Sequence, residues 1–524
     1  MSTVHSSTER SRLSVRSTVT EAQRSIRDVV PLLQFRSSGL RGRSRAGVVA
    51  ALVVIGVVTV LAGWLPVYLP GAAGAGRAVD ALLLLPTAYI GVLVIAIISA
   101  AASGGGRELL PRDQAVVYPV SATTDHLGAL LLAPLNIAWL LQGWTVLGMT
   151  AYVVGSSPTL VAAQLPVLLW LFVATALAQA AAWAVEWVRR GRRGRWTVRV
   201  LVAAFGAAVT VLVATDQLVS VLDRSLTVRI ALGALYGAQG MWMGWFTVVA
   251  VLFVIGVLAV VVGGFLANAV SRRPAHDELR VESSVHTPRT NPGSDFIALL
   301  RVDRVGVWRS VSLRRGLLVL AVLPGLVAVA GALEWSMVTI LPGLVASGGA
   351  LLFGVNAWCL DGRGALWRDS LPVSPRAVFT ARVIVLVEIL LLATLLTMAL
   401  AALRAGVPTV AQLVAVLTAA VVVCVQVVAS SLRWSIRRPF AVDLRSARAT
   451  PAPPLVMVGY SARLALSTTL TGMLFGMIAR FADWHTPLLV ALPFLLFSAY
   501  KLVRSANEWA TPEVRSRVVA TVAS

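Results

Sequence analysis

The chain has 524 residues, of which 58% are hydrophobic and only 13% are charged. Soluble domains carry about 25% charged residues, so this composition excludes an ordinary soluble protein and indicates one embedded in a lipid bilayer. The formal charge of +22 comes from arginines that lie between apolar runs and not from a separate basic domain. Such arginines set the orientation of a membrane protein and lie beside anionic lipid headgroups. The pattern therefore does not indicate a nucleic acid partner.

Twelve apolar runs follow one another along the chain, and each is long enough to cross a bilayer, which takes about 20 residues. The first six lie at 46–68, 80–102, 126–153, 159–187, 197–216 and 242–268, and the second six at 315–333, 336–360, 377–403, 408–431, 455–480 and 485–502. The sequence therefore predicts an all-α polytopic membrane protein with about 12 transmembrane helices.

Polar stretches divide these runs into five parts. We predict a basic leader with an amphipathic approach helix at 1–45, a first six-span half at 46–270, a linker with a second approach helix at 271–314, a second six-span half at 315–504 and a tail at 505–524. The leader is too long for a cleavable signal peptide, and the apolar run after it is long enough to span. A plain basic leader without a surface helix is the alternative.

The arginine distribution predicts the orientation. Nine arginines precede the first span, six lie at 189–199, nine at 272–315 and five at 433–448. The opposite loops hold only Arg77, Arg224, Arg229, Arg404 and Arg480. Because loops rich in arginine stay inside the cell, we expect a multi-pass protein of the plasma membrane with both termini in the cytoplasm.

A short motif occurs twice, each time after the second span of a half. It reads GGGRELLPRDQAVVYPVS at 104–121 and DGRGALWRDSLPVS at 361–374, and we name these segments the first and second elbow. Each copy has Gly-Arg, then Arg-Asp five residues on, then Pro-Val-Ser. A similar basic approach, Arg-Ser-x-x-Leu-Arg, begins at 36 and at 309. The sequence thus predicts two parallel six-helix repeats with both elbows on the cytoplasmic side.

The elbows carry both signs of charge, which suits charge-assisted docking of another protein. The candidate docking residues are Arg107, Glu108, Arg112 and Asp113 in the first elbow, and Asp361, Arg363, Arg368 and Asp369 in the second. The alternative is that these are ordinary interfacial charges at the end of a helix.

The order of approach helix, two spans, elbow and four further spans resembles the transmembrane subunits of type-2 ATP-binding-cassette exporters, which export drugs, polyketides and polysaccharides. LPVSPR at 371–376 is the closer copy of their elbow motif, whereas YPVS at 118–121 has no Pro-Arg after it. The resemblance implies that each elbow is a coupling helix for a separate P-loop ATPase, with two ATPase subunits that bind ATP and Mg²⁺. It also implies export from the cell. The apolar spans, with few charges inside them, favour an amphipathic or lipid-like small molecule of the drug, antibiotic or polyketide type as the substrate.

This chain is expected to be a transport subunit and not an enzyme. Its single lysine, Lys501, lies in no G-x-x-x-x-G-K-[ST] motif, so the chain has no P-loop, catalytic residue or cofactor of its own. Its two cysteines, Cys359 and Cys424, lie in or beside apolar runs without zinc-ligand spacing. We therefore predict packing cysteines and no metal site.

Polar side chains within the spans either line a transport route or hold helices together. They are Asn136, Gln142, Gln164, Gln179, Asn356, Glu388, Gln426 and Arg463. Glu388 and Arg463 have opposite charges at matching depths, which predicts an ion pair. The alternative is that Glu388 is protonated or faces a wet cavity, and that Arg463 extends to the cytoplasmic interface. The amphipathic segment 216–241 is interpreted as a re-entrant or surface helix, or as a plain outer loop.

Two other classes of function fit part of the pattern. A major-facilitator-type secondary transporter also has twelve spans and a charged loop, but its elbow is denser in basic residues and lacks Pro-Val-Ser. A membrane-embedded, lipid-processing enzyme would need acids clustered on an outer loop. Here the outer acids are scattered singly, at Asp80, Asp216, Asp223, Glu334 and Asp483.

Overall fold

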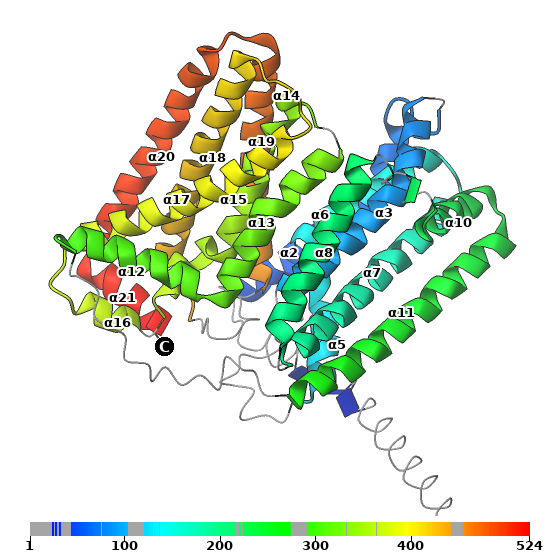
Figure 1. Cartoon of the computed structure of the whole chain (residues 1–524), viewed down its shortest axis with the longest axis horizontal. Helices are drawn as coiled ribbons and strands as arrows, with labels where there is room; N and C mark the ends of the chain where they lie inside the picture. The colour runs from blue at the N-terminus through cyan, green and yellow to red at the C-terminus, as the bar shows by residue number, and fades with distance from the viewer. Residues whose placement is uncertain are drawn as a thin grey trace, which may run out of the picture. The chain divides into compact units, whose positions relative to one another are not determined.

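The computed structural model describes residues 24–25, 27–28, 31–32, 43–74, 76–102, 120–135, 137–191, 193–215, 217, 220–221, 224–273, 292–331, 333–362, 364–441, 452 and 454–523. Over these residues the regular structure is helical and contains no strand, so the predicted all-α class is confirmed. The chain divides into two compact units, unit 1 at Met1–Ser283 and unit 2 at Ser284–Ser524 (Figure 1).

Unit 1 contains ten described helical elements. They are α2 (Arg43–Trp64), η1 (Leu65–Tyr68), α3 (Arg77–Ala102), α5 (Ala122–Leu132), η2 (Ala133–Leu135), α6 (Ile137–Val154), α7 (Leu160–Arg189), α8 (Gly194–Ala214), α10 (Thr227–Gln239) and α11 (Trp242–Ser271).

Unit 2 contains eleven described helical elements. They are α12 (Asp295–Arg309), α13 (Val311–Ala330), α14 (Trp335–Val338), α15 (Leu341–Leu352), η3 (Gly354–Leu360), α16 (Gly364–Asp369), α17 (Pro375–Ala402), α18 (Val410–Arg437), α19 (Pro454–Phe481), α20 (Thr486–Ala510) and α21 (Pro512–Ala523).

A helix lies in each of the twelve intervals predicted as spans. Eight helices in the described ranges are long and apolar enough to cross a membrane, or nine if α12 and α13, bent by 81° at their junction, count as one. Two predicted spans are broken: 126–153, where η2 separates α5 from α6, and 336–360, where the chain leaves helical geometry between α15 and η3. The protein is membrane-embedded, whereas about 12 crossings and two repeats stay predictions.

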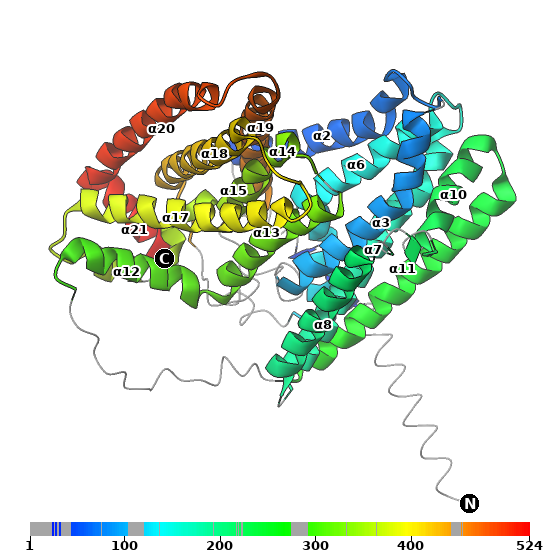
Figure 2. The same cartoon turned by 45° about the horizontal axis from the view of Figure 1, so that its top comes forward.

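The core of unit 1 forms around α7, which packs against α3, α6, α10 and α11 (Figure 2). Two polar contacts join these apolar helices: the Trp170 Nε1–H donates to the carbonyl of Tyr89 at 3.0 Å, and the Tyr89 and Thr150 hydroxyls lie 3.2 Å apart. The hydrogen bonds offset the free energy that these buried groups lose when they leave water.

The second part of the segment 216–241 is the packed helix α10, so the alternative of a plain loop is wrong there. Thr159 donates to the carbonyl of Ala238 at 2.8 Å, and Thr227 donates to that of Pro86 at 3.0 Å. At Gly237 the backbones of α10 and α7 meet so closely that an added Cβ would lie 2.8 Å from the carbonyl carbon of Ala162.

We expect Gly237→Ala to destabilise the protein by about 1–3 kcal/mol, because the added methyl group meets backbone and not a side chain that can rotate away. Gly91→Ala on α3 is the matched control, since its Cβ meets nothing within 4 Å and alanine favours a helix. Thermal unfolding in detergent compares the two variants. Equal midpoints for both would contradict the close contact.

Unit 2 contains a break between α15 and η3. Phe353 and Asn356 leave helical geometry there, with φ of −141° and −148°. The Ser435 hydroxyl of α18 accepts from the Ala357 N–H at 2.8 Å and lies 3.2 Å from the Gly354 carbonyl. A side chain of a neighbouring helix thus pairs backbone groups that the break sets free, as buried irregular backbone requires.

Candidate functional site

The second elbow joins the end of η3 to α17 and contains the short helix α16. Gly362 has a φ of +47°, a left-handed conformation that glycine adopts without a Cβ clash, and it turns the chain from η3 towards α16. Pro375 stands at the start of α17, where a missing N–H costs nothing. Arg363 and the four charged residues of the first elbow, Arg107, Glu108, Arg112 and Asp113, lie outside the described residues.

A cluster of four charged side chains holds the second elbow in place, and we name it the elbow cluster: Asp303 of α12, Asp361, Arg368 of α16 and Arg382 of α17. Arg382 Nη2 lies 3.0 Å from Asp303 and 2.8 Å from Asp361. Arg368 Nη1 lies 2.7 Å and 2.9 Å from the same two carboxylates. Each carboxylate thus faces two guanidinium groups, and the cluster is neutral.

The elbow cluster is buried. The side chains of Asp303 and Arg382 are 0% exposed, and Arg382 also donates to the carbonyl of Ala357. Its guanidinium lies 5.1 Å from the ring centroid of Trp358. Buried charges are tolerated only when they are paired and hydrogen-bonded, so α12, α16 and α17 are fixed to one another at this point.

The charges around Asp303 set its pKa. Burial by itself raises that pKa, but the Arg382 and Arg368 guanidinium groups outweigh burial and hold it below the ordinary value. The folded protein therefore binds this proton less readily than the unfolded chain. The stabilisation is complete above the ordinary aspartate pKa of about 4 and is lost as the pH falls through the folded value.

We therefore expect the stability of Asp303→Asn to depend less on pH in the acidic range than the stability of the parent protein does. The parent protein should lose stability as the pH falls below about 4, whereas the variant, already destabilised at neutral pH, should lose less. Thermal midpoints in detergent from pH 7 downwards measure this. Asp295→Asn, which removes an exposed carboxylate at the start of the same helix, is the control. Parallel profiles for the parent and Asp303→Asn would contradict the assignment.

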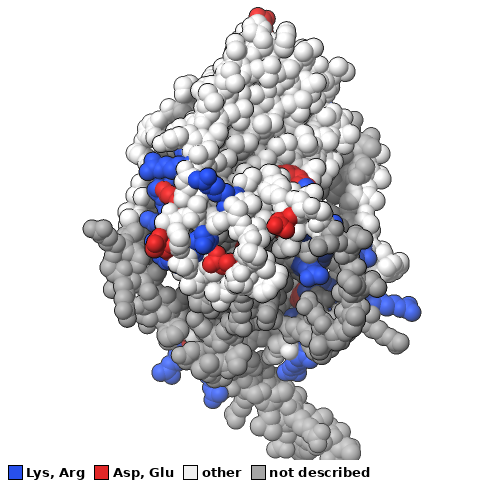
Figure 3. Space-filling model, turned by 90° about the vertical axis from the view of Figure 1, so that its left-hand side faces the viewer, with Lys and Arg blue, Asp and Glu red and all other residues white. Residues whose placement is uncertain are grey.

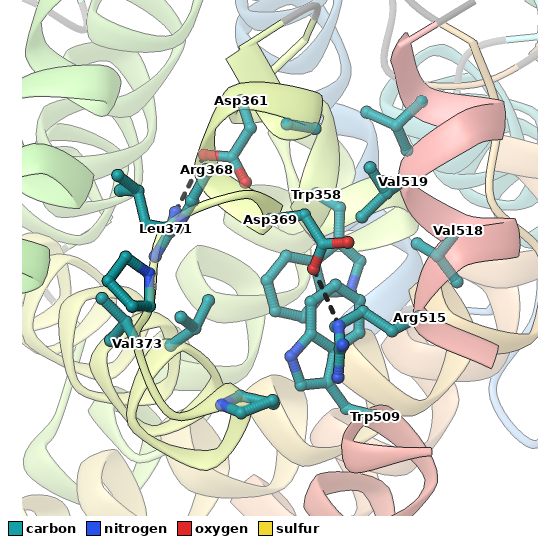
Figure 4. A pocket seen from close by; sticks show the side chains of 15 residues that line it. Trp358, Asp361, Arg368, Asp369, Leu371, Val373, Trp509, Arg515, Val518 and Val519 are labelled. Atoms are coloured by element: carbon teal, nitrogen blue, oxygen red, sulfur yellow. Dashed lines mark hydrogen bonds and ion pairs between the residues drawn. The ribbon is translucent and has the colours of Figure 1, made fainter. Parts of the chain in front are cut away.

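The C-terminal helix α21 packs against α16 on another side of the elbow. Arg515 of α21 pairs with Asp369 at 2.7 Å, and Val518, Val519 and Val522 are buried. Trp358 stacks on Trp509 with ring centroids 3.8 Å apart (Figure 4).

The opposite face of α16 is apolar and free of these contacts. Leu366 and Trp367 are 58% and 67% exposed, whereas Ala365 and Arg368 beside them are buried. Figure 3 shows acidic and basic side chains in the middle of the face that it draws, below a broad uncharged surface that carries one acidic side chain at its top. In the second elbow, three of the predicted docking charges, Asp361, Arg368 and Asp369, pair within the chain.

Polar side chains of the spans mostly join helices. Gln164 donates to the carbonyls of Gly63 and Leu147 at 2.9 Å and 3.0 Å, linking α7 to α2 and α6. In unit 2, Asn356 donates to the carbonyl of Phe440 at 2.6 Å, and Gln426 accepts from Thr471 at 3.3 Å.

The remaining polar residues form no group. Gln179 is buried on α7, and Gln142 is half-buried on α6. Asn136 lies outside the described residues. Gln164, Gln142 and Gln179 belong to unit 1, and Asn356 and Gln426 to unit 2, so their role in a transport route stays a prediction.

The predicted ion pair between Glu388 and Arg463 is wrong. Glu388 instead accepts from Arg304 Nη2 at 2.8 Å, because α12 packs along α17 and brings Arg304 beside it. Arg463 is exposed on α19.

Sequence reasoning missed two members of the elbow cluster, Asp303 and Arg382. Arg382 lies within the predicted span 377–403, and an ionisable residue at such a position signals a buried partner. Asp303 is an acid in a basic approach segment, which carries no such signal.

The chain matches no family model, no curated protein and no solved structure.

Proposed function

We propose that this chain is the membrane permease of an ATP-driven exporter, in which two six-span halves are fused and separate P-loop ATPase subunits supply the energy. The single observation that carries the proposal is the geometry of the second elbow. One face of α16 is fixed by buried charges, and the other presents Leu366 and Trp367 to the outside.

A docking helix must be held rigidly by its own protein on one face and must bind the partner protein with the other. The elbow cluster supplies rigidity, since a displacement of α16 would separate Arg368 from Asp303 and Asp361. The exposed side chains of Leu366 and Trp367 supply the binding energy, because tryptophan is among the residues most enriched at positions that dominate the energy of protein interfaces. The charges of the second elbow thus orient α16, and its apolar face contacts the ATPase.

In this proposal both elbows face the cytoplasm, where ATP and Mg²⁺ bind to two copies of the partner ATPase. Movement of the ATPase passes through α16 to α17 and α12, to which the elbow cluster joins it. The cargo is an amphipathic or lipid-like small molecule, which suits spans with few buried charges. The protein lies in the plasma membrane with both termini inside.

The test is nucleotide hydrolysis by the purified chain with and without a partner. We expect no ATP hydrolysis by the chain in lipid nanodiscs, and hydrolysis once a partner P-loop ATPase, sought in the neighbouring reading frames, is co-expressed and co-purified. Transport into vesicles should then require ATP. Hydrolysis by the chain alone that responds to its mutation would overturn the proposal. Transport driven by an ion gradient without any ATPase would favour a major-facilitator-type transporter instead.

A further inference from the structure

Three cations of unit 2 come from neighbouring helices, and we name them the basic cluster: Arg433 of α18, Arg463 of α19 and Lys501 of α20. α18 packs against both α19 and α20 (Figure 2). Arg433 and Arg463 both lie close enough to Lys501 for the like charges to repel one another. Nothing in the proposed transport role uses these three side chains.

Contacts within one or two turns of the basic cluster fix the three helices to one another. Between α18 and α19, the hydroxyls of Ser431 and Tyr460 lie 2.8 Å apart. Between α18 and α20, Arg437 Nη2 lies 2.9 Å from Glu508 Oε1. Arg433 lies between these two contacts along α18, so packed helices and not a loop set the place of the cluster.

The basic cluster has no acidic partner among the described residues. α18 and α19 contain no acid at all, and Glu508, the one acid of α20, lies 2.9 Å from Arg437 and 3.8 Å from Arg504. Lys501 instead lies over the ring of Phe497, with its Nζ 4.1 Å from the centroid. An anion that binds between the three cations would relieve their repulsion and therefore gains affinity.

The basic cluster lies near the ends of apolar runs. The predicted span 408–431 ends two residues before Arg433, and the predicted span 485–502 ends one residue after Lys501. Arg463 lies further inside its span, but its exposed side chain is long enough to reach the same level. Basic side chains at this level meet the phosphate groups of lipids.

The surface that continues from the basic cluster into the spans is apolar. Leu466 and Leu470 follow Arg463 on α19 at intervals of one turn, and both are exposed. On α20, Phe497 precedes Lys501 by one turn and is also exposed. A molecule with both a phosphate group and hydrocarbon chains can contact the cations and these side chains together, whereas inorganic phosphate can contact only the cations.

We propose that the basic cluster binds the phosphate group of an anionic phospholipid, whose acyl chains lie along the exposed apolar side chains of α19 and α20. The phosphate oxygens accept charge-assisted hydrogen bonds from the two guanidinium groups and from the ammonium group. In the predicted orientation the lipid belongs to the cytoplasmic leaflet, which is the negatively charged one. The site is independent of the exporter proposal, since neither an ATPase nor ATP is needed to form it.

The test is native mass spectrometry of the chain in a neutral detergent, titrated with dioctanoyl phosphatidylglycerol. The variant combines Arg433→Gln, Arg463→Gln and Lys501→Gln, which keep long polar side chains without the charges. We expect saturable binding of one lipid molecule by the parent chain. The variant should bind it at least tenfold more weakly, because each cation near a membrane surface contributes roughly fivefold to the affinity for anionic lipid.

A matched control removes the same amount of charge elsewhere in unit 2. It combines Arg309→Gln, Arg376→Gln and Arg480→Gln, which replace exposed arginines of α12, α17 and α19. This control should bind phosphatidylglycerol as the parent chain does. Equal losses of affinity in the two triple variants would show attraction by net charge alone, and the basic cluster would then be rejected as a site.

Two further probes separate an anionic lipid from other ligands. Dioctanoyl phosphatidylcholine has the same chains and a phosphate but no net charge, so it should bind more weakly, and equal binding would overturn the anionic class. Inorganic phosphate should not displace phosphatidylglycerol at equal concentration. Displacement would assign the site to a free anion and overturn the lipid.

Thermal unfolding in the same detergent checks that both triple variants are folded. If the variant of the basic cluster does not fold, Arg463→Gln alone decides, because the exposed side chain of Arg463 can be replaced without disturbing the packing of α19. Weaker binding of phosphatidylglycerol by Arg463→Gln supports the site, and unchanged binding rejects it.

Discussion

Arg382→Met is expected to lower the free energy of unfolding by about 3–5 kcal/mol, the usual cost of removing one partner from a buried ion pair. The substitution keeps an unbranched side chain but leaves Asp303 and Asp361 with Arg368 as their only shared cation. Two buried carboxylates beside one guanidinium repel each other, and the carbonyl of Ala357 loses its donor. Reversible unfolding in detergent, by denaturant or heat, measures the loss.

The control for this prediction lies on the same two helices. Arg304 of α12 and Glu388 of α17 form an ion pair whose side chains are 48% and 36% exposed. Arg304→Met should therefore cost no more than about 1 kcal/mol, as exposed pairs do. Similar losses for Arg304→Met and Arg382→Met would show that burial of the elbow cluster has no energetic consequence. In a double-mutant cycle, Asp303→Asn with Arg382→Met should cost clearly less than the sum of the two.

Trp367→Ala is expected to weaken capture of the partner ATPase by about 30-fold, which corresponds to roughly 2 kcal/mol for a dominant interface residue. The side chain is 67% exposed, so its truncation should leave the thermal stability of the chain itself unchanged. Leu366→Asp should add to the loss, because a charge would be buried without a partner in the interface. Pull-down of the ATPase and ATP-dependent transport are the two measurements.

Trp308→Ala is the matched control, since Trp308 is exposed to a similar degree, 53%, on α12 and outside the elbow. It should leave partner capture unchanged. If Trp367→Ala and Trp308→Ala behave alike, the apolar face of α16 is no docking surface. Reversal of Asp369 is less suitable as a test, because Asp369 pairs with Arg515 and its loss would also disturb α21.

The sequence alone determined the all-α membrane class of the protein and the position of its second elbow. Mean hydropathy over a window is a local property, so helices at all twelve apolar intervals were predictable before their contacts were known. The second elbow was predictable for the same reason, since Gly362 and Pro375 act on the backbone of their own segment. The break in the span 126–153 was not predicted, although η2 contains Pro134, a residue that interrupts helical hydrogen bonding.

Only the tertiary structure decided which way the elbow charges face. Arg368 meets Asp303 from 65 residues away, and Arg382 meets the same carboxylate from 79 residues away. The same holds for Glu388, whose charge and depth suggested Arg463 until α12 brought Arg304 to it. Charge and hydropathy are properties of one residue, but the partner of a buried charge depends on which helices pack together, and that is set by side-chain shape across the whole unit.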